Sequence, residues 1–487
     1  MIARAMTTAA RRTKILATIG PASDNEATLR GMIAAGMDAV RLNLSHGTVE
    51  EALALHGRVR ALAKEMGRPV GTLVDLPGPK IRAATFGRDG VELADGHRVR
   101  LVPDRDRSTS EVIGVEYESL LDGIEPGDRI AFGDGAIDAE VIEASGDGLE
   151  AVVLHGGRLT GKPGVHIPSE RLRVATPTPE DLRILDAFVG VGVDMVALSF
   201  VRSAHDVRRL GTEPHPRGPL VVAKIETRSA VDNLAGILDA AGAVMIARGD
   251  LGIECPIEEL PHLQKHIIRE CIAHGRPAIT ATQMLESMVR AATPTRAEAS
   301  DVANAVFDGS SAVMLSGETA TGTDPVNVIA TMARLCAHAD ANFDVDNWTR
   351  MVTRLSVEDP ESGHGHIRRV TDTMTDAAWR VAQELDAKAI LCLTRTGFTV
   401  RAIARYRPRT PILGFTPDER VRQQLSISWG ATPLTLSGFA DNEEMVREAV
   451  QVARDDGHVR NGDIVVVLAG IDGRSRTTDV LRVIRVT

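Results

Sequence analysis

Eight short apolar runs recur along the first two thirds of the chain, and each ends in polar or charged residues. The runs are KILATIG (14–20), DAVRLNLS (38–45), PVGTLVDL (69–76), DMVALSF (194–200), LVVAKIE (220–226), AVMIARGD (243–250), PAITATQ (277–283) and AVMLSGE (312–318). Short continuous apolar runs are typical of strands that are buried on both faces of a parallel sheet. We therefore predict eight parallel strands.

Amphipathic segments separate these runs. Clear examples are residues 50–66, 230–242, 257–275 and 294–309, whose apolar residues recur at helical spacing. Eight alternating strand–helix units predict an α/β fold of the (β/α)8 TIM-barrel type. The barrel is expected to span residues 11–82 and 169–343.

The remaining segments predict further domains. Residues 83–168 contain Gly-Asp turns and short alternating runs, which predict an inserted all-β domain placed as a lid over the barrel mouth. Residues 344–370 are polar and are expected to form an irregular connector. Residues 371–487 alternate again and predict a separate C-terminal α/β domain for effector binding or assembly. Residues 1–10 are expected to be a disordered start.

Composition narrows the class of protein. Among 487 residues, 43% are hydrophobic, enough to fill several cores. Acidic residues outnumber basic ones by 66 to 56 and no basic block occurs, which argues against a nucleic-acid partner. No apolar run approaches the roughly 18 residues of a membrane span. The four cysteines lack metal-ligand spacing and are expected to be reduced thiols of a cytoplasmic protein.

Candidate chemistry lies at the strand ends, where barrel enzymes carry their sites. The polar residues there are Arg41, Asn43, Ser45, Asp75, Ser199, Lys224, Glu226, Arg248, Asp250, Thr282 and Glu318. Lys224 and Glu226 are two apart, so they point to the same face of a strand, and Asp250 closes the next strand. Two carboxylates suit a hard divalent cation, and an ammonium can meet a phosphoryl group that the cation also touches. The pattern predicts a metal-assisted anion site.

Several longer segments carry a family resemblance. They are RLNLSHG (41–47), GPKIR (78–82), SFVR (199–202), AKIE (223–226), ARGDLGIE (247–254), ATQMLESM (281–288), PTRAEASDVANAV (294–306) and MLSGETATG (314–322). Together they resemble the pyruvate kinases along nearly the whole chain. The resemblance implies a barrel A domain, an inserted B domain and a C-terminal C domain. It also implies transfer of the phosphoryl group of phosphoenolpyruvate to ADP, giving pyruvate and ATP, by a cytoplasmic homotetramer of glycolysis.

The resemblance also implies roles for the strand-end residues. Lys224 matches the lysine that contacts the transferring phosphoryl group, and Arg41 matches an arginine near that group. Glu226 and Asp250 match the Mg²⁺ ligands, where Mn²⁺ is a possible substitute. The backbone of Gly249 and Asp250 is expected to face the substrate carboxylate. Thr282 matches the threonine beside the enolpyruvate, where we expect it to position substrate or form one link of a water relay.

Nucleotide and monovalent-cation positions follow in the same way. The nucleotide positions are Asn43, Ser45, His46, Arg82 and Lys162. The monovalent-cation position is formed by Asn43, Ser45, Asp75 and the carbonyl of Leu76. Relatives with glutamate at the third position of GPKIR tend to need K⁺, whereas those with lysine tend to work without it. Because this residue is Lys80, we predict an internal cation and no K⁺ requirement.

A possible effector site lies in the C-terminal domain. The turn at 394–399 precedes a helix and could offer N–H groups to a phosphate. The candidate residues are Thr394, Arg395, Thr396, Gly397, Arg474 and Arg476. The family often binds phosphorylated allosteric effectors in this region, and a plain helix cap remains the alternative interpretation.

Two other functions are considered. The first is a metal-dependent enolpyruvate lyase or aldolase on the same barrel, and the inserted domain at 83–168 argues against it. The second is a non-catalytic paralogue that senses a metabolite. Such a protein would be expected to have lost at least one of Lys224, Glu226, Asp250 and Thr282, and all four are present.

Overall fold

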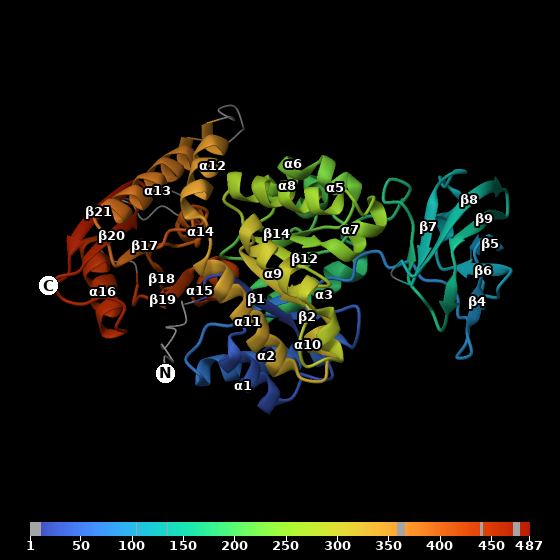
Figure 1. Ribbon diagram of the computed structural model, residues 1–487, viewed down its shortest axis with the longest axis horizontal. Coiled ribbons are helices and arrows are strands. Elements are labelled where there is room, and N and C mark those ends of the chain that lie inside the picture. The colour runs from blue at the N-terminus through green and yellow to red at the C-terminus, as the bar shows by residue number, and fades with distance from the viewer. Residues whose placement is uncertain (1–10, 104, 134, 358–365, 439–441, 471–477) are drawn as a thin grey trace.

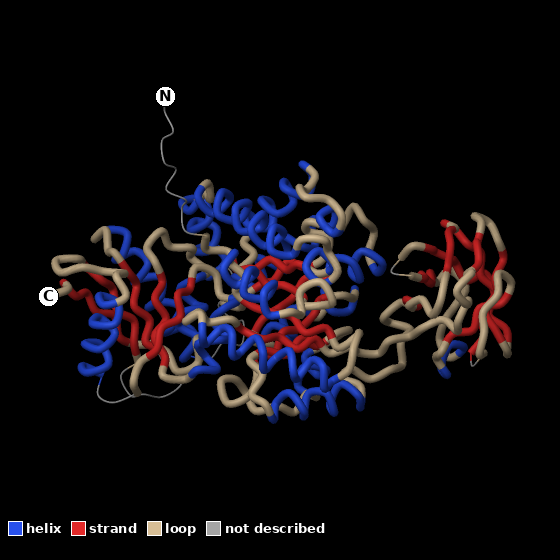
Figure 2. The backbone as a smooth tube through the Cα atoms, turned by 90° about the horizontal axis from the view of Figure 1, so that it is seen from below, coloured by secondary structure: helices blue, strands red, loops and turns tan. Residues whose placement is uncertain are grey.

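The computed structural model describes residues 11–103, 105–133, 135–357, 366–438, 442–470 and 478–487. Its centre is a closed barrel of parallel strands with the hydrogen-bonded order β1-β16-β15-β14-β13-β12-β3-β2. The strands are β1 (Lys14–Thr18), β2 (Ala39–Asn43), β3 (Gly71–Asp75), β12 (Met195–Leu198), β13 (Leu220–Ile225), β14 (Ala243–Ala247), β15 (Ala278–Ala281) and β16 (Ala312–Leu315). Figure 2 shows these strands ringed by helices. The predicted (β/α)8 barrel is confirmed.

Helices cover the outside of the barrel. They are α1 (Glu26–Ala35), α2 (Val49–Glu65), α3 (Pro179–Gly190), α4 (Ala204–Arg208), α5 (Arg228–Asp232), α6 (Leu234–Ala240), α7 (Arg248–Glu254), α8 (Leu260–Ala273), α9 (Arg296–Asp308), α10 (Gly317–Ala320) and α11 (Pro325–Ala341), with a short 3₁₀ turn η2 (Glu286–Val289). Thr48, Thr178 and Thr295 form capping boxes that fix where α2, α3 and α9 begin. The segment predicted as one helix over 230–242 is divided at Asn233 into α5 and α6.

An inserted all-β unit follows β3. Its strands are β4 (Val91–Leu93), β5 (Arg98–Pro103), β6 (Val112–Val115), β7 (Arg129–Phe132), β8 (Ile137–Ser145), β9 (Gly148–His155), β10 (Gly157–Leu159) and β11 (Val165–His166), with the turn η1 (Glu118–Leu121). They form a β11-β7-β8-β9-β5-β6 sheet and a β10-β4 pair around their own apolar core. The unit stands beside the barrel in Figure 1. The chain enters the inserted unit after β3 and leaves it before α3, so the unit lies at the carboxyl ends of the barrel strands.

The C-terminal domain is a five-stranded sheet flanked by helices. Its elements are α12 (Val345–Val357), α13 (His366–Glu384), β17 (Ala389–Leu393), α14 (Phe398–Ala404), β18 (Ile412–Thr416), α15 (Glu419–Gln424), η3 (Leu425–Ile427), β19 (Ala431–Thr435), α16 (Asn442–Asp455), β20 (Ile464–Ala469) and β21 (Val480–Arg485). The strand order is β19-β18-β17-β20-β21, and only the pairing of β20 with β21 is antiparallel.

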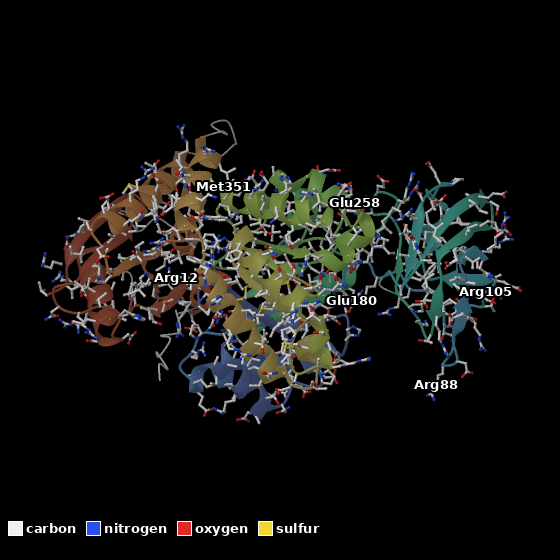
Figure 3. All side chains as sticks on the ribbon, viewed as in Figure 1. Arg12, Arg88, Arg105, Glu180, Glu258 and Met351 are labelled. Atoms are coloured by element: carbon white, nitrogen blue, oxygen red, sulfur yellow. The ribbon has the colours of Figure 1, made fainter. Side chains whose placement is uncertain are left out.

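This domain packs against the amino ends of the barrel strands. Lys14 Nζ at the start of β1 donates to the Ala431 carbonyl at 2.8 Å, and Gln424 Nε2 donates to the Asp194 carbonyl at 3.0 Å. Arg12, labelled in Figure 3 at the junction, donates to the Pro408 carbonyl. The inserted unit and the C-terminal domain therefore lie at opposite ends of the barrel, as Figure 1 shows.

One expectation about the connector is wrong. Residues 344–370 were expected to be irregular, but α12 and the start of α13 occupy most of this segment. Val345, Trp348 and Val352 recur at helical spacing and are buried, and the Trp348 indole N–H donates to the Arg405 carbonyl at 2.8 Å. The helical spacing of these apolar residues is hard to recognise in a mostly polar segment, because only one narrow face of α12 packs against the domain. The expected disordered start lies outside the described residues.

Candidate active site

A buried charge cluster lies at the carboxyl ends of β3 and β13. Lys224 Nζ is 2.7 Å from Glu226 Oε1 and 3.4 Å from Asp75 Oδ1. The side chains of Asp75 and Glu226 are 2% and 1% exposed, so the three charges face one another with little water between them. Lys224 and Glu226 share one face of β13, as their spacing of two residues predicts.

Neighbouring strands complete this cluster. Arg41, at the end of β2, holds Asp75 Oδ2 through Nε at 2.6 Å. Ser199, directly after β12, accepts a hydrogen bond from Lys224 Nζ at 2.8 Å and donates to the Leu76 carbonyl at 2.7 Å. Asp75 thus joins two cations, and its two oxygens fix their positions.

This environment shifts the pKa values of Asp75 and Glu226 in opposite directions. Burial favours a raised pKa for Asp75, but Lys224 and Arg41 outweigh it and lower the pKa below its ordinary value. Burial raises the pKa of Glu226, and although Lys224 opposes this effect, the negative charge of Asp250 adds to it. Glu226 is therefore a buried carboxylate whose charge is under-compensated. A divalent cation held between Glu226 and Asp250 would relieve that repulsion, so the residues present fit such an ion.

The lysine itself remains charged. Burial by itself lowers the pKa of Lys224, but Asp75 and Glu226 outweigh burial, and the pKa lies above its ordinary value. The ammonium is therefore available as a fixed positive charge at neutral pH.

The next two strand ends bring Thr282 beside α7. Gly249 N, in the first turn of α7, donates to Thr282 Oγ1 at 2.9 Å. Thr282 and Gln283 have positive φ values of 67° and 53°, which β-branched residues such as threonine rarely adopt. Strain of this kind is tolerated where surrounding contacts impose it, and it is frequent at functional sites.

The contacts that impose this conformation come from Arg248. Its Nη1 donates to both carboxylate oxygens of Asp301, at 2.8 and 2.9 Å, and its Nη2 donates to the Thr282 carbonyl at 2.6 Å. Arg248 was recognised from sequence as a strand-end residue, but Asp301 was missed. No local signal could have found it, since it lies on α9, 53 residues from Arg248.

Comparisons with known proteins match this chain along most of its length. Family models described as "Pyruvate kinase, barrel domain" and "Pyruvate kinase, alpha/beta domain" match residues 10–329 and 372–484. A pyruvate kinase of Bacillus licheniformis is 38% identical over 478 residues, covering 97% of this chain and 80% of that protein. A pyruvate kinase of Clostridium acetobutylicum is 35% identical over 486 residues, covering 97% and 99%. The chain belongs to the pyruvate kinase family.

A solved structure supports the same assignment. The crystal structure of a pyruvate kinase from Cryptosporidium parvum superposes with a TM-score of 0.89 at 31% identity, covering 98% of this chain and 96% of that one. The protein is accordingly a phosphotransferase of glycolysis that converts phosphoenolpyruvate and ADP to pyruvate and ATP, with dependence on a divalent metal. No helix in the described part of the chain has the length and apolar character to cross a membrane.

The residues predicted from sequence to contact the nucleotide are spread over two regions. Asn43 and Ser45 lie at the end of β2, where Asn43 Oδ1 accepts from Ser45 N at 3.2 Å, and His46 is exposed next to them. Arg82 donates to the Lys162 carbonyl at 3.1 Å, within the base of the inserted domain. The exposed Lys162 side chain pairs with Glu116. Arg82 and Lys162 are thus brought together on the inserted domain.

The monovalent-cation position is already rich in positive charge. Asp75 is paired with both Arg41 and Lys224, and the Leu76 carbonyl accepts from Ser199. Lys80 lies four residues beyond Leu76 and is exposed. The structure therefore surrounds Asp75 with protein cations and leaves the side chain of Lys80 at the surface.

The candidate effector turn caps its own helix. Thr394 Oγ1 accepts from Gly397 N at 2.9 Å, and Thr396 Oγ1 accepts from Phe398 N at 3.3 Å. Two N–H groups that a phosphate would use are thus satisfied within the turn, as in the alternative helix-cap interpretation. Arg395 is exposed beside them. Arg474 and Arg476 lie outside the described residues.

Proposed function

We propose that Lys224 and Arg41 stabilise the phosphoryl group while it passes from phosphoenolpyruvate to ADP. The observation that carries this proposal is the position of both cations on the two oxygens of Asp75, at 3.4 and 2.6 Å. Phosphoryl transfer depends mainly on positioning and on neutralising charge. Cations that are already fixed by a buried carboxylate need no reorganisation when that charge moves, which lowers the barrier.

Glu226 and Asp250 are proposed to hold Mg²⁺, with Mn²⁺ as a possible substitute. Both are hard oxygen donors, and burial together with the negative charge of Asp250 raises the pKa of Glu226, which supports a cation between the two carboxylates. When bound, the ion supplies positive charge to the phosphoryl and enolate oxygens. The chain contributes the orientation: Glu226 Oε2 accepts from Phe200 N at 2.7 Å, which fixes the carboxylate plane.

Thr282 is proposed to position the enolpyruvate and to relay a proton through water. Its hydroxyl already accepts from Gly249 N at 2.9 Å and lies 2.7 Å from the Ala281 carbonyl. A threonine hydroxyl is too weak an acid to protonate a carbon unaided, so a relay is the role its chemistry allows. Since Gly249 N is engaged, the Asp250 N–H is the group we assign to the substrate carboxylate.

A coupled assay for pyruvate tests this proposal against its alternatives. We expect turnover of phosphoenolpyruvate to require both ADP and Mg²⁺. Pyruvate formation without ADP would favour the lyase or aldolase. A complete lack of turnover in folded protein would favour the metabolite-sensing paralogue.

We further propose that the enzyme needs no K⁺. Asp75 is already paired with two protein cations, and a further cation within about 4 Å of one of them would be repelled by roughly 4 kcal/mol at an effective dielectric of 20. Lys80 would bring its ammonium in when the site closes. We expect near-full turnover in tetramethylammonium buffer free of K⁺ and NH₄⁺, and Lys80→Glu should create a K⁺ requirement. Lys388→Glu, on the exposed surface of the C-terminal domain, serves as the control. A rise of about tenfold or more when K⁺ is added to the parent enzyme would refute the idea.

The inserted domain is proposed to close over the barrel mouth and exclude water. Its base contacts the barrel at Glu254, which accepts from Ser169 N at 2.9 Å and lies 2.8 Å from His166 Nε2. We expect trypsin cleavage at the exposed Arg173, near this base, to slow when ADP, Mg²⁺ and a substrate analogue are bound together. Cleavage at the exposed Arg88 and Arg105, which Figure 3 shows far from the barrel, should be unchanged. Equal slowing at all three positions would contradict a hinged lid.

Assembly, effector and compartment are proposed from the family. We propose a cytoplasmic homotetramer in which the turn at 394–397 binds a phosphorylated effector together with Arg474 and Arg476. Light scattering at the 52.1 kDa mass of one chain would overturn the tetramer. Activity that does not respond to any sugar phosphate or nucleotide would overturn the effector site. Fractionation of the source cells would test the compartment.

A further inference from the structure

A buried cavity rich in arginine lies between the barrel and the C-terminal domain. The C-terminal domain contributes Arg401, Arg405, Arg407, Ser428 and Trp429 to its wall, and Trp348 of α12 completes that side. The barrel contributes the chain around Arg276 and the start of β16. The open space inside is ≈ 20 Å³, which holds one body of the size of a water molecule or a halide ion.

Arg401 is a buried cation that forms no ion pair with a carboxylate in the part of the chain that the structure describes. Arg401 is 3% exposed, and its Nη2 donates a hydrogen bond to the Thr396 carbonyl at 2.6 Å. Its Nε and Nη1 atoms are buried without a partner. Burial, together with the neighbouring charge of Arg276, lowers the pKa of Arg401 to about 9. Leaving a guanidinium in this state is costly unless an anion neutralises it.

The neighbouring arginines have partners that Arg401 lacks. Arg405, four residues on, pairs with Asp372 at 2.9 Å, although its Nε remains unpartnered. Arg407 donates to the Val306 and Ser310 carbonyls and lies 5.2 and 4.9 Å from the ring centres of Trp348 and Trp429. None of the described residues that line the cavity is acidic. Among the described residues, Arg401 therefore combines two unpartnered guanidinium nitrogens with the lack of an ion pair.

Further unsatisfied donors belong to residues that line the same space. The Ser428 hydroxyl, in a residue 1% exposed, is also buried without a partner and lines the cavity. Arg401 and Arg405 are four residues apart at the end of α14, so they project from one face of the helix toward the cavity that both line. A guanidinium edge, a second guanidinium Nε and a hydroxyl together form a donor set for an anion.

We propose that this cavity binds one halide-sized inorganic anion, chloride being the abundant one, through Arg401, Arg405 and Ser428. A water molecule would accept hydrogen bonds from these donors but would not neutralise the guanidinium charge. A monovalent anion would accept the hydrogen bonds and also neutralise the charge. The space of ≈ 20 Å³ matches a halide-sized ion more closely than the larger phosphate and organic anions. Because the wall is shared between the barrel and the C-terminal domain, the bound anion would tie the two domains together and stabilise their junction.

Thermal unfolding in matched sodium salts tests this proposal. Replacing sodium gluconate by sodium chloride at constant ionic strength should raise the Tm of the full-length protein. The rise in Tm should saturate as the chloride concentration increases. We expect about 1–2 °C at a chloride concentration ten times its Kd, because the chain has 487 residues and its unfolding entropy is correspondingly large. Arg401→Met, which keeps an unbranched apolar stem without the guanidinium charge, should show no such rise. Arg395→Met, an exposed arginine in the turn before the same helix, should respond like the parent.

A direct measurement covers the case in which Arg401→Met does not fold. Crystals of the parent protein grown in bromide should show an anomalous peak within hydrogen-bond distance of Arg401 Nη1, and its absence would overturn the proposal. An equal chloride response in the parent and in Arg401→Met would overturn it as well. So would a Tm rise with phosphate but not with halide. Catalytic activity enters none of these measurements, so they stand apart from the roles proposed for Lys224 and Asp250.

Discussion

Replacing Lys224 by methionine should lower kcat by about 10²–10³ or more, the usual effect of removing one fixed charge from a developing transition state. The structure makes this effect large, because Lys224 Nζ lies among Asp75, Glu226 and Ser199 and no other ammonium shares that position in the described residues. Arg41 alone would then face the phosphoryl group. The measurement is kcat in a coupled assay at saturating substrates and Mg²⁺.

Lys14→Met is the matched control for this experiment. Lys14 also lies on a barrel strand and also pairs with an aspartate, Asp38, but at the opposite end of the barrel. The two lysine side chains are 11% and 13% exposed, so both variants should lose some stability by leaving a carboxylate unpaired. Only Lys224→Met should lose turnover. Near-native kcat in a folded Lys224→Met variant would reject the assignment.

Replacing Asp250 by asparagine should raise the Mg²⁺ concentration needed for half-maximal activity by about tenfold or more, equivalent to roughly 1.4 kcal/mol. The change removes one of the two carboxylates that are proposed to hold the ion. It also removes the negative charge that raises the pKa of Glu226, so Glu226 should ionise more readily in the variant. Mg²⁺ titrations of activity at saturating substrates measure this effect.

Glu258→Gln supplies the charge-matched control. Glu258 is an exposed carboxylate that follows α7, and Figure 3 labels it at the surface. Its removal changes the net charge by the same amount but should leave the Mg²⁺ titration unchanged. Overlapping titrations of Asp250→Asn and the parent would show that Asp250 is not a ligand. A shift of equal size in Glu258→Gln would assign the effect to long-range charge instead.

The sequence by itself determined the features that depend on the local spacing of apolar and polar residues. Alternating apolar runs and amphipathic segments were enough to predict the barrel and the inserted β unit, because side-chain direction repeats every two residues in a strand and every 3.6 in a helix. The same rule placed Lys224 and Glu226 on one face of β13, where the structure has their charged groups 2.7 Å apart. It failed for α12, whose narrow apolar face was hidden among polar residues.

Only the tertiary structure decided which distant residues meet. The pairing of Asp75 with Arg41 and Lys224 joins three barrel strands, and the pairing of Arg248 with Asp301 joins α7 to α9. Arg401 lacks a counter-charge because of what the barrel and the C-terminal domain place around it, and no spacing along the chain could show this. The physical reason is that burial and ion pairing depend on every element packed around a group, whereas sequence period reports only the direction of each side chain within its own element.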